Sequence, residues 1–556
     1  MERSKKIMKI VIVGGVAGGM SAATRLRRLN EDAEIIILEK GPYVSFANCG
    51  LPYFVSGEIT KRSKLLVQTP ESLRGRFELD VRVNTEALSI DPEKKEILVK
   101  GEEGEYAIEY DKLILSPGAR PFVPNTPGLA EAKNVFTMRN VPDVDAVTGF
   151  MKDMDPKKAV VIGAGFIGLE MAEALHNRGL DVSIVEMAPQ VLPPFDFEMS
   201  AFVKDELEKN GIKVYTGVAA SGFHEEGKIV ELQNGVRLAS DLTVMSVGVL
   251  PENTLAKTAG VELGMRGGIL VDENYETSAK DVYAVGDAII VKNQIMKADS
   301  MIPLANPANR QGRQVADVIS GYRRKNKGAI GTAIVRVFGL SAASVGLNER
   351  QLQAADMKYK AVHVTANDHA GYFPGASSVY MKMLFNPEDG TIYGAQGVGQ
   401  KGVDKRIDIL ATAIKGNLKV DDLMELEFTY APPFGSAKDP VNMLGYAATN
   451  IMEGFSENIQ WYELEDMRKE GAFLLDVRDG KEVERDGSIE GFVNIPINDL
   501  RGRIHELPKD KTIIVSCASG QRSYMAERML KQKGFQAVNL DGAFNIYSRA
   551  KKEEIK

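Results

Sequence analysis

The chain begins with a short apolar run, then glycines, then an amphipathic stretch. Residues 8–14 form a continuous Val/Ile-rich run, which is typical of a strand buried on both faces of a parallel sheet. A glycine cluster follows, and after it residues 20–30 predict a helix and residues 33–40 a second strand. This order predicts a βαβ unit at the start of the chain.

The same pattern recurs about 150 residues later. Residues 159–163 predict a strand, and a glycine turn spans Gly163 to Gly168. A helix over 169–179 and a strand over 181–187 follow. Two such units in one chain predict two nucleotide-binding domains.

The rest of the chain holds no third glycine fingerprint. Residues 105–118 predict strands that end in a tight Pro-Gly turn, and residues 277–288 predict a strand that ends at Asp287. Residues 330–450 alternate strand-like and helix-like stretches, and a different region begins at residue 456. These patterns predict an α/β protein of several domains.

Composition narrows the class. A chain of 556 residues is too long for one core and predicts three or four domains. The net charge of −7 argues against nucleic acid as a partner, and no apolar run reaches the roughly 18 residues that would indicate a membrane span. The N-terminus lacks a small-residue cleavage site, so we interpret it as leading into a strand and not as a signal peptide. Two cysteines form no disulfide framework, which favours a reducing cytoplasm.

The second glycine turn carries a complete fingerprint at Gly163, Gly165 and Gly168. The first glycine permits the turn, the second lets backbone approach a pyrophosphate, and the third lets the helix pack on the strand. Glu186 ends the next strand, where a carboxylate accepts hydrogen bonds from ribose hydroxyls and repels a 2′-phosphate. We therefore expect NADH to be preferred, with NADPH as the alternative.

The first turn is degenerate, because Gly14 and Gly19 match the fingerprint but Val16 takes the middle place. Glu39 ends the following strand, as Glu186 does in the second unit. The turn still predicts a dinucleotide site, with an altered pyrophosphate contact.

The two cysteines stand in different contexts. Cys49 lies in S-F-A-N-C-G-L-P-Y, residues 45–53, where a small buried apolar residue and a nucleophile are the two interpretations. Cys517 opens the loop C-A-S-G-Q-R-S, whose small residues let successive backbone N–H groups turn inward and stabilise a thiolate or persulfide. Arg522 adds charge and anchors that loop, whereas an ordinary strand-end cysteine is the alternative.

These features together resemble the two-dinucleotide-domain flavoprotein reductases. The resemblance rests on the two glycine turns, the Pro117–Gly118 turn and the stretch A-V-G-D-A that contains Asp287. Most disulfide reductases of that group carry a C-x(4)-C pair, but this chain has Cys49 alone, which resembles the coenzyme A-disulfide reductases over residues 8–450. Residues from 456 on, with L-L-D-V-R and the Cys517 loop, resemble a rhodanese domain.

The resemblance implies four domains. They are an FAD-binding domain at 1–115 and 270–328 with 116–150 as connection, an NAD(P)H-binding domain at 151–269, a dimerisation domain at 329–452 and a rhodanese domain at 456–556. It also implies FAD contacts from Gly14, Val16, Ala17, Gly19, Glu39, Lys40, Pro117, Gly118, Arg139, Asp287, Pro303, Leu304 and Ala305. The NAD contacts it implies are Gly163, Gly165, Phe166, Ile167, Gly168, Glu186 and Gly248.

The resemblance further implies that coenzyme A is the thiol partner of Cys49. The coenzyme A contacts are Ser21, Arg25, Arg28, Ser45, Asn48, Cys49, Arg76 and Lys438, with a solvated helix face as the alternative for the arginines. Tyr372 and Tyr430 are implied to reach the active site of the other subunit of a homodimer and to protonate the leaving thiolate, although packed aromatic residues are the alternative. Catalysis is assigned to Cys49, Tyr372, Tyr430, Cys517 and Arg522.

The predicted activity is NADH-dependent reduction of coenzyme A disulfide, coenzyme A persulfide or polysulfide, with the rhodanese domain handling sulfane sulfur. One alternative is an NADH oxidase or peroxidase in which Cys49 cycles through a sulfenic acid. Another is a redox sensor or sulfur carrier. The five histidines are scattered and none pairs with a cysteine, so we assign no metal, and we interpret His369 as a loop histidine.

Overall fold

The computed structural model describes residues 7–555 and divides into two compact units. Residues 1–6, which hold the charged start interpreted above, and residue 556 lie outside the described residues. Unit 1 comprises residues up to Met187 together with Gly217–Gly331, and unit 2 comprises Ala188–Thr216 and residues from Thr332 on. Within the described part of the chain, no helix combines the length and apolar character that a bilayer crossing needs.

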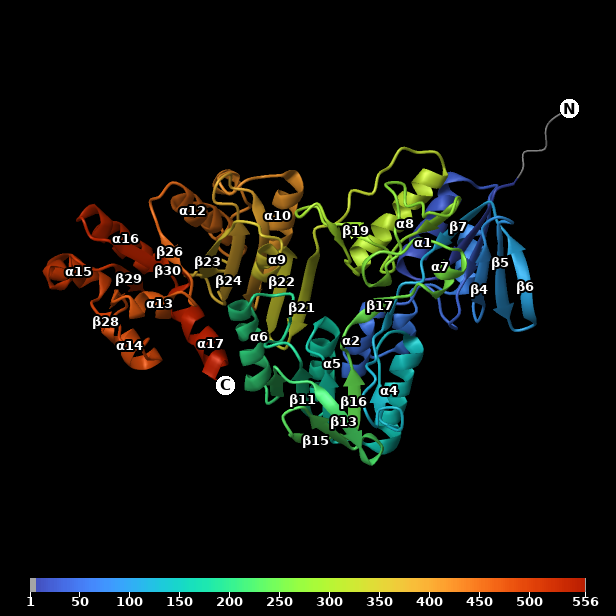
Figure 1. Cartoon of the computed structure of the whole chain (residues 1–556), viewed down its shortest axis with the longest axis horizontal. Coiled ribbons are helices and arrows are strands. Elements are labelled where there is room, and N and C mark those ends of the chain that lie inside the picture. Colours follow the sequence, from blue (N-terminus) through green and yellow to red (C-terminus); the bar gives the residue numbers. More distant parts are fainter. Residues whose placement is uncertain (1–6, 556) are drawn as a thin grey trace. The chain divides into compact units, whose positions relative to one another are not determined.

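Both predicted βαβ units lie in unit 1 (Figure 1). The first sheet is parallel, with the order β18-β7-β1-β2-β3. Its strands are β18 (Val282–Ala284), β7 (Lys112–Leu115), β1 (Lys9–Val13), β2 (Glu34–Leu38) and β3 (Asp80–Arg82). Helices α1 (Ala17–Leu29) and α8 (Ala305–Ile319) pack against each other beside it. The apolar run of the first strand is buried as predicted, with Val11 and Ile12 both fully covered.

The second parallel sheet contains the order β11-β10-β16-β9. These strands are β11 (Asp181–Glu186), β10 (Lys158–Ile162), β16 (Leu242–Met245) and β9 (Val135–Phe136). Its main helices are α4 (Val141–Met154) and α5 (Phe166–Asn177). Smaller elements complete unit 1: α2 (Leu51–Ser56), α3 (Pro70–Phe77), α7 (Thr254–Thr258), β4 (Glu86–Asp91), β5 (Glu96–Gly101), β6 (Gly104–Glu109), β8 (Ala119–Pro121), β13 (Ala220–His224), β14 (Ile229–Leu232), β15 (Arg237–Ala239), β17 (Val249–Pro251), β19 (Val291–Lys292) and β20 (Asp299–Ser300).

One predicted strand is shorter than expected. The strand predicted over 277–288 is β18, which begins at Val282 and ends at Ala284. Gly286 adopts φ +84°, a left-handed conformation that does not continue a strand, so the backbone turns away between Ala284 and Asp287. Asp287 therefore lies on the loop after the strand.

Unit 2 contains an antiparallel sheet with the order β21-β22-β25-β24-β23, which covers the predicted dimerisation domain (Figure 1). Its strands are β21 (Thr332–Val337), β22 (Leu340–Gly346), β25 (Ile392–Gly399), β24 (Ser378–Phe385) and β23 (Lys360–Asn367). The helices of this region are α9 (Glu349–Ala354), α10 (Val403–Gly416), α11 (Asp422–Glu425) and α12 (Pro440–Met452). Unit 2 also includes α6 (Phe197–Lys209) and β12 (Lys213–Thr216), which come from the predicted NAD(P)H-binding segment.

The predicted rhodanese domain is a parallel sheet with helices around it, also in unit 2 (Figure 1). The order is β26-β30-β29-β27-β28, from β26 (Asn458–Ile459), β30 (Ala537–Leu540), β29 (Ile513–Ser516), β27 (Phe473–Asp476) and β28 (Val493–Asn494). Its helices are α13 (Leu464–Lys469), α14 (Gly480–Asp486), α15 (Ile497–Arg503), α16 (Gln521–Gln532) and α17 (Ala543–Ile555). Helix α17 packs beside α6.

Candidate functional site

The first glycine turn has no space for side chains. Gly14 adopts φ +98°, and a Cβ there would lie 2.0 Å from the carbonyl oxygen of Ser116. A Cβ on Gly19 would lie 1.9 Å from the carbonyl oxygen of Gly14. The Glu39 carboxylate accepts hydrogen bonds from the N–H groups of Gly15 and Gly41, each at 2.9 Å. The turn, the N-terminus of α1 and this carboxylate thus form the surroundings that a dinucleotide requires.

The second glycine turn repeats this construction. A Cβ on Gly163 would lie 2.4 Å from the Ser246 carbonyl oxygen, whereas a Cβ on Gly165 would meet nothing within 4 Å. That open space lets a phosphate approach the backbone at the start of α5. The Glu186 carboxylate accepts a hydrogen bond from the Ala164 N–H at 2.7 Å. The structure therefore brings the predicted NAD fingerprint and its acid together.

The other predicted nucleotide contacts surround the two turns. Ala17 and Phe166 begin α1 and α5, while Lys40 and Ile167 are exposed. Gly248 is exposed with φ +107°, and its carbonyl oxygen accepts a hydrogen bond from Phe122. Leu304 precedes Ala305, where α8 begins, directly after Pro303.

Arg139 lies close to three residues that were predicted to contact FAD or substrate, namely Gly118, Asp287 and Asn48. A Cβ on Gly118, which has φ +72°, would lie 2.7 Å from an Arg139 Nη atom. The Arg139 guanidinium lies 4.0 Å from the Asp287 carboxylate. With the Asn48 amide oriented to satisfy both groups, its nitrogen donates to the Arg139 carbonyl at 3.1 Å and its oxygen accepts from Nη1 at 2.8 Å. Burial raises the pKa of Asp287, and Arg139 partly opposes that shift.

Cys49 lies on a short 3₁₀ turn, Asn48–Gly50, that leads into α2. The residue is exposed, yet the protein packed around its sulfur raises the pKa of the thiol, and the charges of Glu170 and Asp287 raise it further. Arg139 acts in the opposite direction. The thiol side chain therefore faces two carboxylates, which disfavour the thiolate.

Glu170 was not identified from the sequence. It lies on α5, which packs against α2, and its carboxylate accepts a hydrogen bond from the Tyr53 hydroxyl at 3.0 Å. Its position four residues into a helix gives no signal in the sequence, because only the packing of α2 on α5 brings it to Cys49.

The predicted coenzyme A contacts of unit 1 divide into paired and exposed residues. Ser21 donates to Asn309 at 2.6 Å, and Arg25 Nε donates to the buried Asp317 at 2.7 Å. Arg25 is thus held by an ion pair, and it shares the Asp317 carboxylate with Arg324, whose Nε lies 3.1 Å from it. Ser45 links the Cys49 loop to the glycine turn, since its N–H donates to the Gly15 carbonyl at 2.7 Å. Arg28 and Arg76 are exposed on α1 and α3.

The two predicted tyrosines lie together on the surface of unit 2. Tyr372 is 76% exposed and Tyr430 is 50% exposed, and their hydroxyl oxygens are 3.2 Å apart. The hydrogen bond to Tyr430 raises the pKa of Tyr372. Lys438 is exposed immediately before Asp439, which caps α12. Tyr372, Tyr430 and Lys438 belong to unit 2, whereas Cys49 belongs to unit 1.

Cys517 lies at the end of β29 and at the start of α16, with only 2% of its surface exposed. Its sulfur accepts a hydrogen bond from the Gly520 N–H at 3.1 Å and lies 3.3 Å from the Ser523 hydroxyl. Gly520 adopts φ +104°, a conformation that other residues rarely adopt. Of the predicted inward N–H groups, that of Gly520 donates to the sulfur, and α16 begins directly after Gly520.

Arg522 anchors this loop through Glu482 of α14. Its two Nη atoms lie 2.5 and 2.7 Å from the two Glu482 carboxylate oxygens. This bidentate pair lowers the pKa of Glu482 to about 2. Arg522 is therefore held beside the loop by an acid that sequence reasoning did not select.

The sequence also did not reveal a group of four carboxylates that surrounds one histidine and one lysine in unit 2. His363 and Lys382 are buried on neighbouring strands and contact four carboxylates, from Asp196, Glu198, Glu349 and Asp541. His363 and Asp541 are 178 residues apart in sequence and Lys382 and Glu198 are 184 residues apart, so no local pattern marks them. His369, by contrast, is a loop residue as interpreted, and its Nδ1 lies 2.7 Å from Asp368.

Comparison with protein families places three domains along the chain. Residues 8–312 match the pyridine nucleotide-disulphide oxidoreductase family, and residues 332–440 match the dimerisation domain of that family. Residues 460–550 match the rhodanese-like domain.

Individual relatives agree with this assignment. The coenzyme A disulfide reductase of Staphylococcus haemolyticus (strain JCSC1435) is 36% identical over 448 residues, covering 80% of this chain and all of the relative. Among solved structures, reduced CoADR-RHD of Bacillus anthracis is 49% identical, with a TM-score of 0.97 and 99% of each chain covered. The NAD-dependent persulfide reductase from A. fulgidus is 36% identical, with a TM-score of 0.92 over 97% of this chain and 100% of that one.

The matched residues include both glycine turns, Cys49, the antiparallel sheet of unit 2 and the two loops that carry Tyr372 and Tyr430. The matched family covers more than half of the chain, the Staphylococcus haemolyticus relative aligns with 80% of it, and the Bacillus anthracis structure aligns with 99%. The chain belongs to the pyridine nucleotide-disulphide oxidoreductase family and carries a C-terminal rhodanese-like domain.

Proposed function

We propose that the protein is an FAD-containing, NADH-dependent reductase of coenzyme A disulfide and of coenzyme A persulfide or polysulfide. The observation that carries this proposal is the single cysteine of unit 1, Cys49, exposed on a loop bound to Arg139 and to the first glycine turn. The other cysteine of the chain lies in unit 2, so a small thiol is the natural disulfide partner of Cys49.

The described residues fit the two nucleotides. The crowded turn at Gly14 and Gly19 and the Glu39 carboxylate suit FAD, and Asp287 suits its ribityl–phosphate part. Glu186 suits the ribose hydroxyls of NADH and disfavours the extra phosphate of NADPH. When bound, FAD would pass two electrons from NADH to a disulfide at Cys49.

The proposed reaction takes place at the Cys49 sulfur. The thiolate attacks one sulfur of coenzyme A disulfide, so that a mixed disulfide forms and one coenzyme A thiolate leaves. Tyr430 or Tyr372, from the partner subunit of a homodimer, gives a proton to that leaving thiolate. Two electrons and one proton from NADH, with one proton from solvent, then complete the release of two coenzyme A thiols, NAD⁺ and the free Cys49. A persulfide substrate gives one coenzyme A thiol and hydrogen sulfide instead.

The proposed role of Cys517 is to carry sulfane sulfur as a persulfide. Its sulfur already accepts the Gly520 N–H, and Arg522 adds positive charge beside the loop. Both features stabilise the anion that a persulfide carries at neutral pH.

The test is Cys49→Ser in the full-length holoenzyme. We expect turnover of coenzyme A disulfide with NADH to fall by at least about 1,000-fold, because a hydroxyl cannot form the mixed disulfide. FAD content, measured by absorbance, should remain at the wild-type level, and Cys517→Ser serves as the matched control that retains this turnover. Retained activity in Cys49→Ser would refute the proposal.

An NADH oxidase is the second candidate, because the water-forming NADH oxidase from Lactobacillus brevis is 25% identical over 80% of this chain, with a TM-score of 0.77. Oxygen uptake with NADH alone separates the two. NADH oxidation that proceeds on oxygen at the same rate with and without coenzyme A disulfide would favour the oxidase.

A further inference from the structure

A row of alternating charges is buried in unit 2, where α6, the dimerisation sheet and the rhodanese-like domain meet. We call it the buried charge chain, and each member is less than one tenth exposed. Its members, in spatial order, are Asp541, His363, Glu198 and Lys382, followed by Asp196 and Glu349.

The two cations of the buried charge chain, His363 and Lys382, lie on neighbouring strands. His363 on β23 pairs in register with Lys382 on β24, and like charges in that arrangement repel. Glu198 of α6 resolves the repulsion because it contacts both, with His363 Nε2 at 3.2 Å and a close contact to Lys382 Nζ. The Lys382 ammonium also lies 2.9 Å from Asp196 and 2.6 Å from Glu349.

Asp541, at the other end of the buried charge chain, belongs to the rhodanese-like domain. The Asp541 carboxylate accepts the His363 backbone N–H, at 3.1 Å on each oxygen, and lies 2.8 Å from the His363 ring nitrogen Nδ1. It also accepts from Gln460 Nε2 at 3.0 Å. Burial alone would lower the pKa of His363, but Asp541 and Glu198 outweigh it and raise the pKa to about 9. The histidine is therefore charged at neutral pH, and the contact is a buried ion pair.

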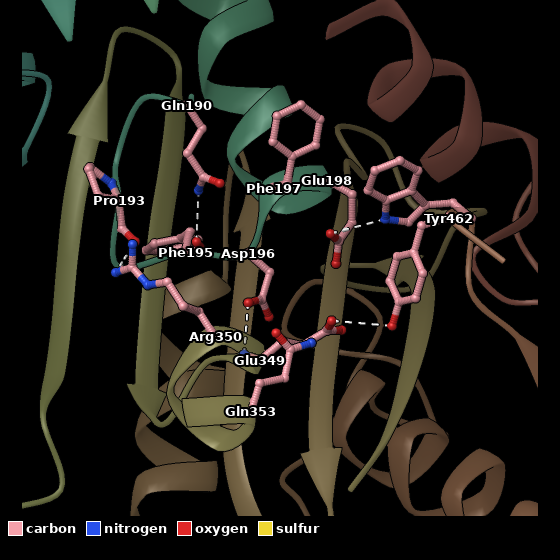
Figure 2. Close-up of a pocket in the computed structure, with 11 residues that line it drawn as sticks. Gln190, Pro193, Phe195, Asp196, Phe197, Glu198, Glu349, Arg350, Gln353 and Tyr462 are labelled. Carbon is pink, nitrogen blue, oxygen red and sulfur yellow. Dashed lines mark hydrogen bonds between the residues drawn. The ribbon is translucent and has the colours of Figure 1, made fainter. Parts of the chain in front are cut away.

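Glu198 and Glu349 of the buried charge chain also bind the start of the rhodanese-like domain. Figure 2 shows these contacts around a pocket of about 310 Å³. Trp461 Nε1 donates to Glu198 at 3.3 Å, and the Tyr462 hydroxyl donates to Glu349 at 3.4 Å. The Trp461 ring also stacks on Phe197, with 5.7 Å between the ring centres. Two separate segments of the rhodanese-like domain thus bind one charged group.

Asp541 lies beside the sulfur-carrying position. Strands β29 and β30 are parallel with Val515 opposite Asn539, and Cys517 and Asp541 each come directly after their strand, at the carboxyl edge of the sheet. Directly after Asp541, the N–H groups of Phe544 and Asn545 donate to the carbonyl oxygens of Cys517 and Ala518, both at 3.0 Å. A residue that is anchored to the dimerisation domain is therefore the immediate neighbour of the Cys517 loop.

We propose that the buried charge chain fixes the Cys517 loop against the dimerisation domain, with His363 and Asp541 as positioning residues for sulfur delivery. The physical basis is that removing one partner of a buried ion pair leaves the other charge buried and uncompensated, so the contact resists separation of the two domains. Sulfur then leaves Cys517 from a fixed place on unit 2. This inference rests on the proposed role of Cys517 as a sulfur carrier.

The test compares three reactions of Asp541→Asn in the full-length holoenzyme. The first is coenzyme A disulfide reduction, which does not involve Cys517. The second is sulfur transfer from thiosulfate to cyanide, in which the Cys517 thiolate takes the outer sulfur and releases sulfite, and cyanide then removes that sulfur as thiocyanate. The third is NADH-dependent reduction of polysulfide, in which sulfur has to move on from Cys517.

We expect the first two rates to stay within about two-fold of wild type and kcat of the third to fall about ten-fold or more, because misplacement by a fraction of an ångström is costly for group transfer between sites. His363→Gln should give the same pattern. Lys552→Gln is the matched control, since it removes an exposed ion pair between α17 and Asp205 of α6 and should change none of the rates.

Unchanged polysulfide reduction in both Asp541→Asn and His363→Gln would overturn the inference, provided that Cys517→Ser loses that reaction. Loss of the thiosulfate reaction as well would also overturn it, because the residues would then support the loop itself. If Cys517→Ser keeps polysulfide reduction, the proposed role of Cys517 fails. In that case, amide hydrogen exchange tests only whether the buried charge chain holds the rhodanese-like domain against the dimerisation domain. Faster exchange of residues 458–463 in Asp541→Asn would support this contact, and unchanged exchange would overturn it.

Discussion

Cys49 and Cys517 are the two thiols of the chain, and their surroundings differ in almost every respect. Cys49 is exposed on a short turn before a helix of six residues, and Glu170 and Asp287 raise the pKa of its thiol. Cys517 is buried at the start of a helix of twelve residues, and its sulfur accepts a backbone N–H from Gly520.

The two sets of surroundings imply different routes by which each thiol becomes reactive. The polypeptide around Cys517 supplies the inward N–H of Gly520, the N-terminus of α16 and a nearby arginine that is paired with Glu482. The described residues around Cys49 include only Arg139 as a charge that favours its thiolate. We therefore expect the bound flavin and substrate to complete the site at Cys49, whereas the Cys517 site is complete in the polypeptide.

The largest expected effect comes from Cys517→Ser. Sulfur transfer from thiosulfate to cyanide should fall by at least about 1,000-fold, because serine cannot hold sulfane sulfur as a persulfide. Coenzyme A disulfide reduction by the same protein should stay within about two-fold of wild type, because Cys49 is intact. Thiocyanate formation and NADH oxidation measure the two rates. A parallel loss of both would show that the two thiols do not form separate sites.

Much of unit 1 could be predicted because its signals are local. The turns at Gly14 and Gly163 demand glycine, since a Cβ would collide with backbone, and each demand is visible in a few adjacent residues. The contact between the Cys517 sulfur and the Gly520 N–H could be predicted for the same reason. The end of β18 was predicted wrongly, because apolar residues continue after Ala284 while the backbone already turns at Gly286.

The partners that modify these sites could not be predicted because they are distant in sequence. Glu170 reaches Cys49 only through the packing of two helices, and Asp541 reaches His363 across 178 residues. The pairing of Arg25 with Asp317 spans 292 residues, and it holds an apparently free side chain in place. Local patterns identify groups that react, whereas tertiary packing decides their charge and position.

A medium effect is expected from Gly520→Ala, which alters only the Cys517 side of the comparison. A Cβ at Gly520 would have space, with the nearest atom 3.9 Å away, so the cost arises from φ +104° alone and is about 1–3 kcal/mol. The backbone should relax and move its N–H away from the sulfur, which lowers thiosulfate sulfur transfer about ten-fold.

Gly534→Ala is the matched control for that substitution. Gly534 has φ +81° and lies at the other end of α16, where a Cβ would meet nothing within 4 Å. It imposes similar backbone strain without any hydrogen bond to Cys517. Equal losses in the two variants would mean that strain, and not the N–H at the sulfur, explains the effect.

The smallest effect is expected from Glu170→Gln, which alters only the Cys49 side. Removing this negative charge should lower the pKa of the Cys49 thiol, so that the thiolate forms at lower pH. We expect the pH profile of Cys49 alkylation in the reduced holoenzyme to move to lower pH, which raises the rate near neutral pH about three-fold.

Tyr53→Phe is the matched control for Glu170→Gln, because it removes the hydroxyl that donates to Glu170 and keeps the carboxylate charge. Its alkylation profile should stay close to that of wild type, since a charge at this distance acts mainly through its field. The rate of Cys517 alkylation, followed in the same samples by mass spectrometry, should not change in either variant. An upward shift, or an equal shift in both variants, would show that Glu170 does not disfavour the Cys49 thiolate through its charge.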